Sequence, residues 1–132
     1  MKMKLAISAL ALIASTAAPA AALSDAIQAD MPQLIALYRD LHANPELSMQ
    51  EYRTPAKLAP EMRKLGFGVT EKVGKTGVVA VYHNGADPTV MVRTELDALP
   101  MEEKTGLPYA SRAKALFNGR DTYVAHSCGH DI

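Results

Sequence analysis

The sequence predicts a mixed α/β fold, because two predicted helices precede three short stretches with the composition of β-strands. Apolar residues recur at helical spacing over residues 24–41, and start and stop signals indicate a second helix over about residues 48–65. The strand-like stretches follow within residues 67–94 and are rich in valine. Helices that precede neighbouring strands are typical of a sheet covered by helices, so one α/β layer is expected.

The first predicted helix, residues 24–41, has sequence signals at both ends. Ser24-Asp25 is typical of a helix N-cap. Asn44-Pro45 is a turn signal that ends the helix. Pro32 lies inside this stretch, where it is expected either to kink the helix or to begin a second segment.

The second predicted helix begins near Ser48, because Ser48 and Glu51 have the spacing of a capping box. Gly66 is a plausible stop just beyond its last turn. Two prolines, Pro55 and Pro60, disagree with a smooth helix, and a truly interior proline costs about 3 kcal/mol.

Three strands are predicted after these helices. Residues 67–73 and 78–83 are separated by a glycine-rich turn at residues 74–77, which is typical of a hairpin. A loop at residues 84–88 leads to the third stretch, residues 89–94. This last stretch is apolar enough for a buried strand.

Residues 1–22 are predicted to be a secretory signal peptide. Lys2 and Lys4 give it a positive start, and the apolar, alanine-rich run that follows is shorter than the ~20 residues of a membrane span. Small residues around Ala20 and Ala22 predict cleavage after one of these two positions. We therefore expect an exported protein, periplasmic or secreted, without membrane contact after cleavage; an uncleaved anchor is the alternative.

The charge balance and the single cysteine restrict the function further. The chain has 14 basic and 14 acidic residues, so removal of Lys2 and Lys4 leaves 12 against 14, a net charge of −2. This balance does not suggest a nucleic-acid partner. One cysteine, Cys128, cannot form an internal disulfide, so in an exported protein it is a free thiol, an intermolecular bridge or a metal ligand.

The segment His126-Ser127-Cys128-Gly129-His130-Asp131 predicts part of a metal site. In an extended or sharply turned segment, Cys128 and His130 can point to the same side. A thiolate and an imidazole suit zinc, cobalt or a similar divalent ion, but a catalytic zinc usually takes three protein ligands. On these residues alone, a small buried cysteine beside an idle surface histidine is the alternative.

A second constellation follows the third predicted strand. Glu95 and Asp97 are two residues apart at the carboxyl end of that strand, where open α/β sheets place their sites. Carboxylates there can bind a metal or hold a metal-binding histidine in the correct tautomer. Two acids in a solvated loop are the alternative.

Four segments in this order resemble one family: Arg39–Leu47, Arg93–Pro100, Glu103–Ser111 and His126–Asp131. They are similar to the aminoacylase/carboxypeptidase family of co-catalytic metallopeptidases, in the branch of hippurate hydrolase and the plant indole-acetyl-amino-acid amidohydrolases. The resemblance covers about Asp25–Ile132, and four ordered motifs are far more specific than one.

The resemblance implies a fold and an activity. Residues 23–132 would form the N-terminal portion of a sandwiched mixed-sheet catalytic domain that holds two divalent ions, zinc, manganese or cobalt. The full-length protein would hydrolyse the amide bond of N-acyl amino acids or related small, peptide-like amides, as a monomer or an oligomer. The family's glutamate pair, which supplies the general base, lies beyond its Cys-Gly-His-Asp motif, so residues 23–132 alone are expected to be inactive.

The resemblance also implies roles for particular residues. Cys128 and His130 match metal ligands of this branch, and Asp97 matches the aspartate that supports the metal centre through one of its ligands. Glu95 departs from the aspartate usual at its position, which keeps the charge but lengthens the arm and leaves its role as a ligand open. His126 matches a family position that is not assigned as a ligand.

Two other functions are considered. A cysteine hydrolase would use Cys128 as its nucleophile, but His130, only two residues away, is a poor geometric partner for it. A non-catalytic exported module that binds metal or a partner protein is the second alternative.

Overall fold

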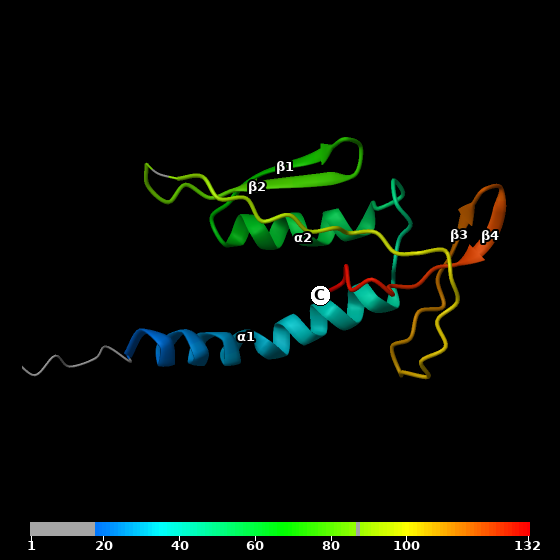
Figure 1. Cartoon of the computed structure of the whole chain (residues 1–132), viewed down its shortest axis with the longest axis horizontal. Coiled ribbons are helices and arrows are strands. Elements are labelled where there is room, and N and C mark those ends of the chain that lie inside the picture. The colour runs from blue at the N-terminus through cyan, green and yellow to red at the C-terminus, as the bar shows by residue number, and fades with distance from the viewer. Residues whose placement is uncertain (1–17, 87) are drawn as a thin grey trace, which may run out of the picture. The chain divides into compact units, whose positions relative to one another are not determined.

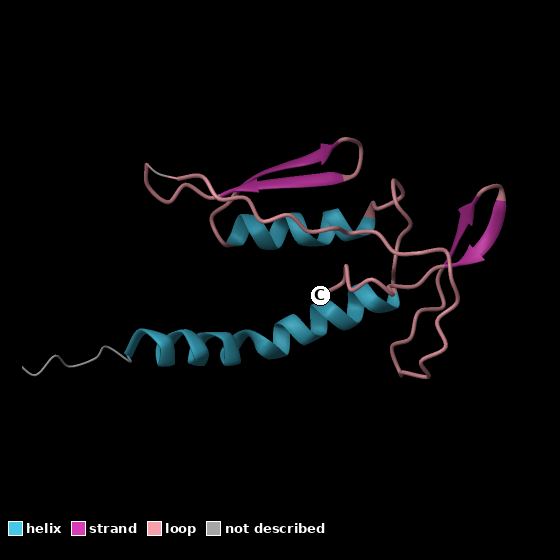
Figure 2. Cartoon of the chain, viewed as in Figure 1, coloured by secondary structure: helices cyan, strands magenta, loops and turns pink. Residues whose placement is uncertain are grey.

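The computed structural model describes residues 18–86 and 88–132, with side chains from residue 21 onward. These residues form two helices and four strands, drawn in chain order in Figure 1 and by type in Figure 2. The chain divides into two units at Pro32, and the unit Gln33–Ile132 contains the strands and every site residue discussed below. The elements are α1 (Ala18–Ala43), α2 (Arg53–Lys64), β1 (Gly68–Val73), β2 (Gly77–Val81), β3 (Lys114–Phe117) and β4 (Arg120–Tyr123).

Helix α1 confirms the first predicted helix and is longer at both ends. It contains Pro32 without an interruption, so no second segment begins there. It ends at Ala43, and the side chain of Asn44 donates a 2.8 Å hydrogen bond to the backbone carbonyl of Asp40. The predicted signal peptide lies largely outside the described residues, and only residues 18–22 of it belong to α1. Within the described residues, neither helix has both the length and the apolar character of a membrane span.

Helix α2 confirms the second predicted helix but begins at Arg53, so the predicted capping box at Ser48 is wrong. A helix from Ser48 would carry Pro55 in its interior, where proline clashes with the preceding turn. Beginning at Arg53 places Pro55 in the first turn, where backbone N–H groups have no helical partner in any case. Pro60 remains inside the helix.

The N-terminus of α2 is capped from a distant position. The carboxylate of Glu46 accepts hydrogen bonds of 2.8 Å from the backbone N–H groups of Tyr52, Arg53 and Thr54. Burial alone would raise the pKa of Glu46, but these backbone donors lower it below its ordinary value. A carboxylate at a helix N-terminus is also stabilised by the helix dipole.

Replacing Glu46 with alanine is therefore expected to destabilise the fold by about 1–2 kcal/mol at neutral pH, the usual cost of losing an N-cap. Because the folded pKa of Glu46 is depressed, its stabilisation is complete above the unfolded pKa and is lost as the pH falls through the folded pKa. The difference from wild type should thus shrink in acid. Urea unfolding at neutral and acidic pH measures it, with the exposed Glu102→Ala as control; equal losses in both variants would contradict the capping role.

Strands β1 and β2 confirm the predicted hairpin to within two residues. They pair antiparallel from Gly68 opposite Val81 to Val73 opposite Gly77, with an irregularity between Glu71 and Val73. A Cβ atom on Gly77 would lie 2.7 Å from the carbonyl oxygen of Val73, so glycine is required there. The hairpin packs beside α2 (Figure 1).

The third predicted strand is wrong as a strand. Residues 89–94 have no regular structure, and Val90, Met91 and Val92 are 80%, 83% and 89% exposed. A strand exists through hydrogen bonds to a neighbour, and none of the described residues pairs with this stretch. The α/β class is confirmed, but the expected mixed sheet is not formed by the described residues, whose strands make two separate antiparallel pairs.

The second pair, β3 and β4, was not predicted from the sequence. Its two-residue turn is Asn118-Gly119, with positive φ angles of 51° and 75°. Asn-Gly is a strong signal for a tight hairpin turn with this backbone geometry. The flanking strands are largely exposed and show no clear alternation of apolar and polar residues, so the strands themselves gave no signal beside the Asn-Gly turn.

A small buried core joins three distant parts of the chain. Leu47, Ala98 and Val124 are 3%, 4% and 1% exposed and pack together. Leu47 and Ala98 form a parallel bridge, while Leu99 and Ala125 form an antiparallel one with N···O distances of 3.0 Å. This core brings together the segments on which the predicted site residues lie.

Candidate functional site

Two site residues lie directly beside the buried core. Asp97 precedes the core residue Ala98, and His126 follows the bridged residue Ala125. The backbone of both segments is therefore fixed by packing and by bridge hydrogen bonds, although residues 95–97 lie at the end of an irregular stretch. His130 is four residues beyond His126, after a turn in which Gly129 has a φ of 79°.

The structure brings His130 together with both acids of the second constellation. Its Nδ1 lies 2.9 Å from the backbone oxygen of Asp97 and 3.0 Å from Asp97 Oδ1. Its Nε2 lies 3.0 Å from Glu95 Oε2. Burial alone would lower the pKa of His130, but hydrogen bonds to Asp97 and the charges of Asp97 and Glu95 raise it above its ordinary value.

This arrangement suits a metal-binding histidine. Both ring nitrogens of His130 face carboxylates here, so the contacts shown favour an imidazolium. Loss of the Nε2 proton would expose a lone pair on Nε2 while Nδ1–H still donates to Asp97, which is the tautomer of a metal ligand oriented by a carboxylate. One carboxylate oxygen of Glu95 lies beside Nε2 of His130, and the other accepts a 2.7 Å hydrogen bond from Arg93. The imidazole and carboxylate groups that meet here are ligand types that a divalent metal such as zinc accepts.

Cys128 does not join this cluster as a third ligand. Its thiol is exposed. Across residues 18–86 and 88–132, no group of three or more His, Cys, Asp and Glu side chains is arranged to hold a metal ion. The assignment of Cys128 and His130 as ligands stays a prediction. A cysteine hydrolase is disfavoured, because both ring nitrogens of His130 already contact oxygens of Glu95 and Asp97.

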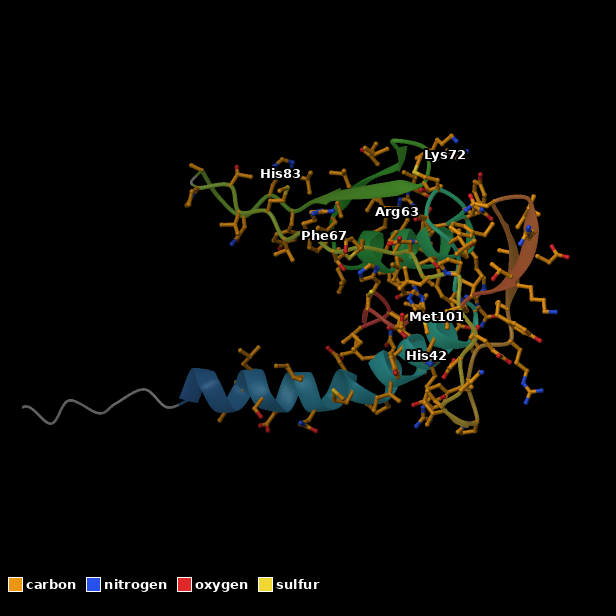
Figure 3. All side chains as sticks on the ribbon, turned by 45° about the vertical axis from the view of Figure 1, so that its right-hand side comes forward. His42, Arg63, Phe67, Lys72, His83 and Met101 are labelled. Atoms are coloured by element: carbon orange, nitrogen blue, oxygen red, sulfur yellow. The ribbon has the colours of Figure 1, made fainter. Side chains whose placement is uncertain are left out.

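A second buried cluster was missed by the sequence reasoning. His42, at the end of α1, has Nδ1 at 2.6 Å from Asp131 Oδ2 and Nε2 at 3.1 Å from Glu103 Oε1. The three side chains are only 9%, 4% and 5% exposed. Figure 3 labels His42 on this helix. All three residues lie in segments that carry the family resemblance. Glu103 and Asp131 are 61 and 89 positions from His42, so no local sequence pattern predicts that they meet.

The protonation of this cluster follows from its contacts. Burial alone would lower the pKa of His42, but hydrogen bonds to Glu103 and Asp131, together with their charges, raise it. Burial would likewise raise the pKa of Glu103, but donors from Thr105, Ser111 and His42 lower it. The raised pKa of His42 and the lowered pKa of Glu103 favour an imidazolium paired with the Glu103 carboxylate.

His126 lies close enough to the His130 cluster and the His42 cluster for the charges of both to act on its pKa. Its Nδ1 is buried and has no hydrogen-bond partner among the described residues. Burial lowers the pKa of His126; the charge of Asp131 opposes this shift, and the charges of His42 and His130 add to it. His126 is thus favoured as a neutral imidazole, and no finding assigns it as a ligand.

Comparison with known proteins supplies relatives for the chain. It is 41% identical over 101 residues to N-acetyl-L-cysteine deacetylase of Bacillus subtilis, which is 76% of this chain and 22% of that protein. It is 40% identical over 92 residues to hippurate hydrolase of Campylobacter jejuni, covering 69% of this chain and 22% of that protein. No family model matches the chain.

A solved structure is similar as well. A dinuclear metal-binding peptidase of the M20 family from Bacillus subtilis matches with a TM-score of 0.66 and 35% identity, over 79% of this chain and 27% of that one. The chain spans about a quarter of the length of the curated relatives it matches, between 22% and 26% for three of them. The predicted resemblance is confirmed, because these relatives are hydrolases of the predicted family.

Proposed function

We propose, from the premise that the relatives of this chain are amidohydrolases and peptidases of the M20 family, that the full-length protein hydrolyses the amide bond of N-acyl amino acids or related small amides with a divalent metal. Residues 23–132 would form part of its catalytic domain. The observation that carries the proposal is the contact of His130 with Asp97 and Glu95, because it unites two predicted segments in one polar cluster.

The proposed roles of the residues combine the contacts of His130 with the family resemblance. When bound, a divalent metal polarises the amide carbonyl and lowers the pKa of a bound water toward about 7. Cys128 and His130 would hold the metal, with zinc, manganese and cobalt as candidates and two ions as the proposed number. Asp97, at 3.0 Å from Nδ1 of His130, would hold the proton on Nδ1, so that a metal replaces the proton on Nε2. Glu95, at 3.0 Å from Nε2, adds a carboxylate at the same position.

The test is metal-dependent hydrolysis by the full-length protein. We expect N-acetyl and N-benzoyl amino acids to be hydrolysed, the activity to disappear after chelation, and zinc, manganese or cobalt to restore it. Residues 23–132 expressed alone should be inactive with any of these metals, because two ligands from one segment cannot close a catalytic site. Hydrolysis that survives chelation would contradict the proposal. A full-length protein that binds metal but hydrolyses none of these amides would favour the non-catalytic module.

A further inference from the structure

We propose that His42 is a positioning residue, which fixes the segment Cys128–Asp131 by clamping Asp131 against α1 and the loop that carries Glu103. The inference rests on the proposed function in one respect, namely that this segment binds the metal. His42 itself lies outside the predicted ligand set and contacts neither Cys128 nor His130 by a hydrogen bond in the described structure.

The clamp is a charged one, as its geometry shows. Both ring nitrogens of His42 face carboxylate oxygens, at 2.6 Å and 3.1 Å. A neutral imidazole donates from one nitrogen only, so its second nitrogen would direct a lone pair at an ionised oxygen. An imidazolium donates to both Asp131 and Glu103, and such charge-assisted hydrogen bonds are about twice as strong as neutral ones.

The burial of the partners makes His42 essential to the cluster. The Asp131 and Glu103 side chains are 4% and 5% exposed, and a buried carboxylate without a cation or donors is costly. Glu103 has other donors, since Thr105 and the backbone N–H of Ser111 also bond to it. Within the described residues, the side-chain hydrogen bond recorded for Asp131 is the one to His42.

The ring of His42 is itself held in place. The rings of Tyr38 and Tyr109 lie with their centroids 5.5 Å from its own, Tyr109 edge-on. Tyr38 and His42 are four residues apart on α1, so they share one face of the helix. The orientation that aims Nδ1 at Asp131 is therefore set by aromatic packing as well as by charge.

The effect on the candidate metal segment follows from chain connectivity. Asp131 follows His130 directly in the chain, and the Cα atoms of consecutive residues are about 3.8 Å apart. His130 is thus restrained on one side by its own contact with Asp97 and on the other by the anchor of its neighbour. Loss of the clamp would leave only the first restraint, and metal ligands depend on such outer contacts for about 10- to 100-fold in affinity.

The experiment is a double-mutant cycle on the full-length protein with His42→Asn, Asp131→Asn and the combination. Cobalt affinity is measured by absorption, and amide hydrogen exchange of residues 126–132 is measured in the metal-free protein. Each single substitution should weaken cobalt binding by about 10- to 100-fold. The combination should be no worse than the poorer single variant, because His42 acts through Asp131. The control His83→Asn, on the exposed loop after β2 (Figure 3), should match wild type.

Exchange in the metal-free protein separates this inference from the proposed function. We expect faster exchange within residues 126–132 in His42→Asn, with unchanged protection in β1 and β2, whereas general destabilisation would affect both. If wild type binds no cobalt but exchange of residues 126–132 is still faster in His42→Asn, the proposed metal function is contradicted and the positioning role of His42 is supported. Unchanged exchange and affinity in His42→Asn, or additive losses in the cycle, would overturn the clamp. If His42→Asn does not fold, the isosteric Asp131→Asn variant decides by the same two measurements.

Discussion

Replacement of Cys128 by alanine is expected to remove bound metal and hydrolytic activity together from the full-length protein. A thiolate is a strong ligand for zinc and cobalt, and alanine offers no donor atom at its position. Loss of a direct ligand should cost more than the about 10- to 100-fold in affinity that loss of an outer partner costs. Because the thiol is exposed, the substitution removes little packing, so a folding defect should not mimic the result.

Metal content and kcat/KM are to be measured on the same preparations of wild type, Cys128→Ala and Cys128→Ser. Serine should rescue little, since a hydroxyl is a poor substitute for a thiolate. Ser127→Ala is the matched control, because Ser127 is an exposed neighbour with no predicted role. Full metal content without the thiol would show that Cys128 is not a ligand.

Replacement of Asp97 by alanine is expected to lower the rate by about 10- to 100-fold while part of the metal is retained. The carboxylate bonds to Nδ1 of His130 at 3.0 Å, but the backbone oxygen of Asp97 contacts the same nitrogen at 2.9 Å and survives the substitution. His130 would therefore keep one orienting contact and lose the charged one.

Asp97→Asn retains an acceptor oxygen without the charge, so its activity should lie between wild type and Asp97→Ala. The exposed Asp121, on the turn side of β4, provides the control substitution Asp121→Ala. Metal content and initial rates distinguish the two roles of the aspartate. Complete loss of metal in Asp97→Ala would contradict a supporting role and indicate a direct ligand, whereas unchanged rates would indicate no role at all.

Local signals predicted one of the two hairpins, because the Asn118-Gly119 turn of β3 and β4 was not recognised. The hairpin of β1 and β2 follows from two valine-rich stretches around a glycine turn, and the structure has it nearly as expected. The start of α2 could not be predicted locally, because its cap is Glu46, which lies six to eight residues before the N–H groups that it accepts. Residues 89–94 were expected as a strand from their apolar character, but composition cannot supply the neighbouring strand that pairing requires.

The candidate site divides in the same way. Glu95, Asp97 and His130 were proposed from short spacings and from family resemblance, and the structure brings them into contact. The pairing of His42 with Glu103 and Asp131 depends on how three segments pack, and no residue spacing records it. The charged clamp was therefore visible only in the structure.

The most direct test of the metal assignment is the absorption spectrum of the full-length protein loaded with cobalt. A cysteine thiolate bound to cobalt gives a charge-transfer band in the near ultraviolet, which imidazole and carboxylate ligands do not produce. We predict this band in wild type and in Ser127→Ala, and its loss in Cys128→Ser. Stoichiometric cobalt binding without the band in wild type would contradict the account, because the metal would then lie away from Cys128.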